Sequence, residues 1–105
     1  MDPITWLILT AVAQLVIDVV IRLLHLAFAT LTDWFVDKQA QLATDPNALA
    51  VTVAQSLRSG DFNIVQGIFD QRAGTFVGRP RRVRANSADR RVVQAHTGRP
   101  VTVWT

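Results

Sequence analysis

The 105-residue chain contains no cysteine, no glutamate and no tyrosine, and it has ten arginines but a single lysine. The absence of cysteine excludes a disulfide scaffold, a thiol nucleophile and a cysteine-ligated metal site. The two histidines, His25 and His96, lie in chemically opposite parts of the chain, and the aspartates do not cluster. We therefore expect no catalytic residues, no metal site and no cofactor, and we interpret the chain as non-enzymatic.

The charges are distributed unevenly along the sequence. Residues 1–70 contain three basic side chains and seven aspartates, whereas residues 71–105 contain eight arginines and one aspartate. The two parts therefore have net charges of −4 and +7, within a total of +3. An asymmetry of this kind predicts a basic arm that meets an anionic partner, either nucleic acid or a phospholipid surface.

Glycine and proline are absent from residues 4–36, which form a nearly continuous apolar run. Asp2 followed by Pro3 is a typical start of a helix. As one helix, this run would be about 50 Å long, which exceeds the ~30 Å hydrocarbon core of a bilayer. The sequence therefore predicts one long apolar helix within residues 1–37, inserted in a membrane as a transmembrane helix or buried in the core of a soluble oligomer.

Five polar residues recur at helical spacing within the apolar run: Thr10, Gln14, Asp18, Arg22 and His25. On a helix they would form one narrow polar stripe, in which Asp18 and Arg22 have the i,i+4 spacing that favours an ion pair. We expect this stripe to face partner helices or a water-filled lumen in an assembly of several copies. A pore-forming, channel-like membrane protein is therefore an alternative function.

The remaining sequence divides into two further parts. Asp45-Pro46 predicts the start of a second helix and Asp61 the start of a third, so that residues 38–74 would form a helical hairpin. Residues 75–105 lose the helical period and contain short β-type pieces at 75–77, 82–84, 91–94 and 101–104, separated by loops. They predict a small Arg-rich β-hairpin or three-stranded element at the C-terminal end. The fold class expected for the whole chain is therefore mainly α.

Six arginines of the last part are the candidate phosphate-binding residues: Arg79, Arg81, Arg82, Arg84, Arg90 and Arg91. A planar guanidinium donates several hydrogen bonds to phosphate at once, whereas the lysine ammonium contacts phosphate less specifically. Phe76 and Trp104 are too few aromatic residues for a base-stacking surface, so nucleic acid would be contacted through its backbone. Binding of anionic lipid and simple solvation of a sheet edge are alternative roles for the same arginines.

These features favour a non-enzymatic structural subunit of a homo-oligomeric, membrane-associated assembly, comparable in its charge order to a coat or envelope protein. Its partners would be further copies of itself and an anionic partner, either nucleic acid or phospholipid. A small accessory subunit of a larger complex is a third interpretation. A soluble oligomer is the alternative to a location in the membrane.

Overall fold

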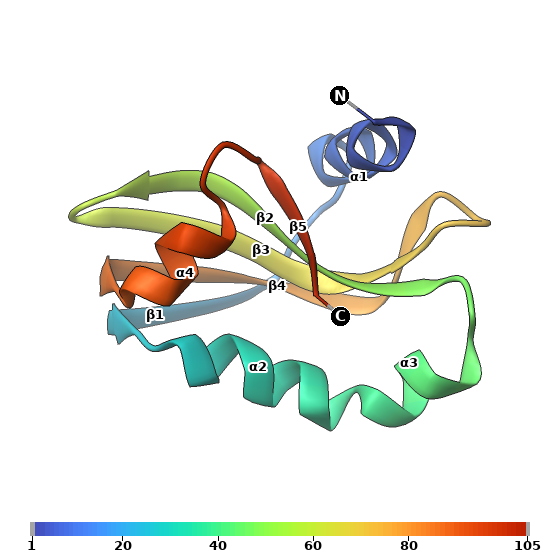
Figure 1. Ribbon diagram of the computed structural model, residues 1–105, viewed down its shortest axis with the longest axis horizontal. Helices are drawn as coiled ribbons and strands as arrows, with labels where there is room; N and C mark the ends of the chain where they lie inside the picture. The colour runs from blue at the N-terminus through green and yellow to red at the C-terminus, as the bar shows by residue number, and fades with distance from the viewer. Residues whose placement is uncertain (1, 105) are drawn as a thin grey trace.

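The computed structural model describes residues 2–104, which form one five-stranded sheet with helices on both of its faces (Figure 1). The elements in chain order are α1 (Pro3–Ala13), β1 (Val19–Leu26), α2 (Phe28–Asp37), α3 (Gln39–Thr44), β2 (Ala48–Arg58), β3 (Asp61–Asp70), β4 (Thr75–Ala88), α4 (Arg90–Ala95) and β5 (Val101–Trp104). The strand order is β1-β4-β3-β2-β5. β1 runs parallel to β4, and every other neighbouring pair is antiparallel.

Both faces of the sheet are covered by apolar side chains from helices. On one face, Ile8 and Val12 of α1 pack in a cluster with strand residues such as Val65. On the other face, Leu31 of α2 and Val92 of α4 belong to a second cluster with residues of β1, β3 and β4. Because successive side chains of a strand point to opposite faces, β3 contributes to both clusters and is buried almost throughout.

The single long helix expected within residues 1–37 is wrong. The apolar run divides into α1, β1 and α2, and α1 ends at Ala13. Five of the six residues 16–21 are β-branched, and such side chains lose rotamer freedom in a helix but pack well on a sheet. No helix in residues 2–104 has both the length and the hydropathy needed to cross a bilayer. The transmembrane helix expected from this run is therefore wrong, and the membrane association inferred from it loses its basis.

The helical hairpin expected within residues 38–74 is also wrong, because this part of the chain forms a β-hairpin preceded by the short helix α3. β2 and β3 pair antiparallel from Ala48 opposite Asp70 to Arg58 opposite Asp61. Gly60, with a φ of +85°, provides the left-handed backbone conformation that the connecting turn requires. More residues lie in strands than in helices, so the fold is mainly β and not mainly α.

The Arg-rich end does not form a separate β-hairpin or three-stranded element, because β4 and β5 are not neighbours in the sheet. β4 includes residues 85–88, which the composition predicts to be a loop, because pairing with both β3 and β1 overrides this local preference. Residues 91–94 lie in α4 and not in a strand. Val101–Trp104 forms β5, as its β-type composition predicts.

Candidate phosphate-binding face

The β2–β3 hairpin extends the sheet beyond the area that α1 covers. Val53 and Val65 lie opposite each other and belong to the apolar cluster beneath α1. Closer to the turn, the same side of the sheet carries polar side chains. We call this surface the open face and define it by these residues: Arg22, Gln55, Arg58, Asp61, Asn63, Arg82 and Arg84.

The strand register brings the arginines of the open face together. Arg84 lies opposite Asn63 of β3 on one side and opposite Arg22 of β1 on the other. Arg82 is two residues before Arg84, so both side chains leave the same face of β4 at a spacing of about 6.6 Å. The like charges of Arg22 and Arg84 on these neighbouring strands repel each other, so an additional anion between them would be stabilised.

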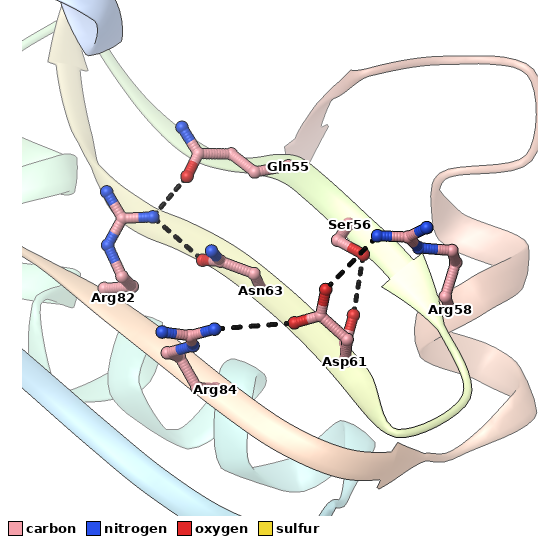
Figure 2. Close-up of polar contacts among 7 residues, drawn as sticks. All are labelled: Gln55, Ser56, Arg58, Asp61, Asn63, Arg82 and Arg84. Atoms are coloured by element: carbon pink, nitrogen blue, oxygen red, sulfur yellow. Dashed lines mark hydrogen bonds and ion pairs between the residues drawn. The ribbon is translucent and has the colours of Figure 1, made fainter.

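Two uncharged amides hold Arg82 in place (Figure 2). Its Nη1 donates to Asn63 Oδ1 at 2.9 Å and also to Gln55 Oε1. Gln55 is the extra residue at a register shift between Ala54 and Ser56, and a bulge of this kind redirects a side chain. The two amides orient the guanidinium without neutralising its charge. Within the described residues the N–H groups on Nε and Nη2 have no acceptor, so they are available to an external anion.

Asp61 provides the one carboxylate of the open face. Its Oδ1 accepts from Arg84 Nη2 and its Oδ2 lies near Arg58 Nη2, each at 3.5 Å (Figure 2). Ion pairs between such exposed groups contribute only ~0–1 kcal/mol. Four arginines against one aspartate give the open face a net charge of +3, equal to the formal net charge of the whole chain.

A small pocket adjoins this cluster between the β2–β3 turn and the end of β4. It has a volume of about 200 Å³, and Arg22, Asp61, Arg84 and Asn86 are among the residues that line it. Pockets for small organic ligands have volumes of about 300–1,000 Å³. This pocket is smaller, and its two guanidiniums suit an anionic group of the size of a phosphate.

Arg81 leaves the opposite face of β4 and is held beneath α2. Its Nε donates to Gln66 Oε1 at 2.8 Å, and its Nη2 donates to the Thr30 carbonyl at 3.0 Å. Gln66 Nε2 in turn donates to the Leu31 carbonyl at 2.8 Å. Burial lowers the pKa of the Arg81 guanidinium from its usual value. Arg81 therefore links the sheet to α2 and is not placed to meet an external phosphate.

The other candidate arginines lie away from the open face. Arg79 is exposed at an irregularity of β4, where the register with β3 shifts. Arg90 and Arg91 are exposed on α4, which packs on the opposite face of the sheet, and the Arg91 guanidinium lies 4.0 Å from the centre of the Phe28 ring. Of the six predicted arginines, the structure therefore brings Arg82 and Arg84 together.

The residues of the predicted polar stripe are distributed over three parts of the chain. Thr10 lies in α1, where its Oγ1 donates to the Trp6 carbonyl, and Gln14 is the C-cap of α1. Asp18 lies in the segment between α1 and β1. Arg22 and His25 lie in β1 three positions apart, so they leave opposite faces of the strand. The structure does not bring these five residues together in one stripe.

His25 joins the ends of β1 and β4 to the start of α2. Its Nδ1 lies 2.8 Å from Ser87 Oγ and its Nε2 lies 3.1 Å from Asp89 Oδ1. Asp89 Oδ2 accepts from the Phe28 backbone N–H at 2.7 Å, and this bond and the one to His25 lower the pKa of the Asp89 carboxyl. The three side chains have the composition of a hydrolase triad. Ser87 Oγ also lies 3.2 Å from the Leu24 carbonyl, so the Leu24 carbonyl and His25 Nδ1 are alternative acceptors for its proton.

Sequence reasoning did not identify Gln55, Arg58, Asp61 or Asn63 as site residues. Their proximity to Arg82 and Arg84 depends on the β2–β3 hairpin, which the sequence pattern presents as two helices. The alternation of Arg82, Val83 and Arg84 is the signal that finds two of the site residues, since it predicts a strand with both arginines on one face.

Comparison of the chain with known protein families, with curated protein sequences and with solved structures finds no match.

Proposed function

We propose that the protein is a non-enzymatic binding protein for nucleic acid and that its open face contacts the phosphate backbone. The observation that carries this proposal is the arrangement of Arg82, whose guanidinium is oriented by two uncharged amides while its charge is left unpaired. Charge-assisted hydrogen bonds from guanidinium to phosphate are strong, and an oriented guanidinium loses less entropy on binding. The arrangement therefore suits recognition of an anion from outside the chain.

The chemistry of the open face favours backbone contact over contact with bases. The face contains arginine and amide side chains and no aromatic residue on which a base could stack. Phe76 packs beneath α1 at 5.4 Å from the ring of Phe69, and Trp104 packs against Phe28 and Phe35. We therefore expect binding that is sensitive to salt and nearly independent of base sequence.

Fluorescence anisotropy with the full chain tests the proposal. Labelled duplexes of unrelated sequence should bind with similar affinity. Contact with three to four phosphates predicts a slope of about −3 to −4 for log affinity against log salt concentration. Arg82→Gln and Arg84→Gln should each weaken binding and reduce the slope by about one unit. Arg82→Lys should keep most of the slope but lose affinity, because lysine cannot hold the two amides and a phosphate together.

Arg90→Gln is the matched control, since it removes the same charge from α4 on the other side of the sheet. It should leave the slope and the affinity nearly unchanged. Vesicles of anionic phospholipid are offered in parallel under the same conditions. Preference for vesicles over DNA, or equal losses for Arg82→Gln and Arg90→Gln, would overturn the proposal.

A further inference from the structure

β1 forms an edge of the sheet, and its outer side has no strand partner within the described residues. It is eight residues long, whereas the other edge strand, β5, has four. The Leu24 carbonyl accepts from Ser87 of β4, so the even-numbered residues of β1 direct their backbone groups toward β4. The odd-numbered residues, such as Ile21 and Leu23, therefore direct their N–H and C=O groups outward, where a second strand can pair with them.

The side chains along this edge form a pattern that is complementary to its own reverse, since apolar positions match apolar ones and the acidic position matches the basic one. The even-numbered residues from 16 to 24 are all exposed, and they are Val16, Asp18, Val20, Arg22 and Leu24. The order is apolar, acidic, apolar, basic, apolar. The outer apolar side chains are among the most exposed large apolar residues, with Val16 91% and Leu24 82% exposed.

We propose that two copies of the chain dimerise by antiparallel pairing of their β1 edges about a two-fold axis at Val20. In this register Val20 meets Val20 of the second copy, and Val16 meets Leu24 on each side of it. Asp18 of each copy meets Arg22 of the other. The odd-numbered residues form the hydrogen-bonded pairs, so the even-numbered ones occupy the positions where side chains of paired strands approach most closely.

Charge complementarity identifies a second copy as the occupant of this edge. In the described part of the chain neither Asp18 nor Arg22 takes part in an ion pair. The two-fold pairing gives each charge an opposite partner and covers the exposed apolar side chains in the same step. Residues 16–18, which link α1 to β1, extend the strand in the dimer. Arg22 belongs both to this edge and to the open face, but the pairing of the two edges does not require nucleic acid.

Sedimentation velocity of the full chain over a concentration series provides the first test. The wild type should show a monomer–dimer equilibrium. Leu24→Lys places a charge against the apolar Val16 at both ends of the contact and should shift the equilibrium to monomer, as exposed lysines do at natural sheet edges. Val36→Lys adds the same charge at another exposed apolar residue, on α2, and should leave the dimer intact. A wild type that stays monomeric, or a dimer that survives Leu24→Lys, would overturn the proposal.

Charge reversal tests the register itself. Asp18→Arg and Arg22→Asp each convert the two attractive pairs into repulsive ones, so each variant alone should dimerise about tenfold more weakly or worse. A mixture of the two variants restores both opposite-charge pairs and should form a heterodimer. Circular dichroism confirms that each variant is folded. Folded variants that do not associate when mixed, while the wild type is dimeric, would exclude this register.

Discussion

Arg81→Gln tests most directly whether the alternation of side chains along β4 gives Arg81 a role in stability and Arg82 a role in binding. Arg81 and Arg82 are neighbours in β4, but their side chains leave opposite faces of the sheet. Arg81 donates to Gln66 and to the Thr30 carbonyl beneath α2, whereas Arg82 lies on the open face. We therefore expect Arg81→Gln to lower the stability of the fold, and Arg82→Gln to leave it nearly unchanged while it weakens binding.

The magnitude follows from the contacts that Arg81→Gln removes. A hydrogen bond from a charged donor contributes about 1.5–3 kcal/mol to the free energy of unfolding, and two are lost. The guanidinium also lies 5.4 Å from the centre of the Trp34 ring, a contact worth ~0.5–1 kcal/mol. Glutamine restores part of this bonding, and the variant no longer has to bury a charge. We therefore expect a loss of about 3 kcal/mol.

Urea unfolding followed by tryptophan fluorescence and far-ultraviolet circular dichroism measures this loss for the wild type, Arg81→Gln and Arg82→Gln. The dependence on urea should have the same slope in all three proteins, so that the midpoints report stability. The reasoning is refuted if Arg81→Gln unfolds within ~0.5 kcal/mol of the wild type. It is also refuted if Arg82→Gln is destabilised as much as Arg81→Gln, because the two side chains would then not differ in burial.

Two further substitutions probe the interior on either side of the sheet. His96 is 4% exposed and bonded to Thr52, and burial lowers its pKa below the usual 6.5. The unfolded chain therefore binds a proton at His96 at a higher pH than the folded chain does. Thermal stability should decrease as the pH falls below about 6.5. His96→Gln should make the melting temperature depend less on pH in this range. Gly67→Ala would place its Cβ 2.8 Å from the Phe76 ring, so chemical denaturation should show a loss of about 1–3 kcal/mol.

The start of α1 follows directly from the sequence, whereas the elements after it do not. Asp2 accepts from the Thr5 backbone N–H at 2.9 Å, as its position before Pro3 predicts. This signal is local, since a side chain caps its own helix. The length of the apolar run, by contrast, does not indicate which secondary structure the run adopts. A strand buried on both faces is apolar at nearly every position, and only its long-range partners distinguish it from a buried helix.

In the candidate site too, local sequence patterns predict some features of single residues and miss those that depend on long-range pairing. The alternation of Arg82 and Arg84 is a property of a short segment and indicates that they share a face. Which face is open depends on where α1, α2 and α4 pack, and the sequence does not show this. Arg81 and Arg90 were therefore predicted to bind phosphate although they lie away from the open face. Gln55 and Asn63 orient Arg82 through pairings between strands, which no pattern within one segment contains.

Dimerisation through β1 would also change how the protein meets a polyanion. The two-fold pairing matches even-numbered residues with even-numbered residues, so the open faces of both copies lie on the same side of one continuous sheet. A long duplex that contacts one open face can then reach the second, and the linked contacts raise the apparent affinity.

Leu24→Lys should therefore weaken binding to long duplex DNA by about tenfold or more, although it adds a positive charge. Val36→Lys adds the same charge without disturbing β1 and should bind like the wild type. Equal affinities of the two variants in an anisotropy titration would show that a single open face holds the duplex without the second.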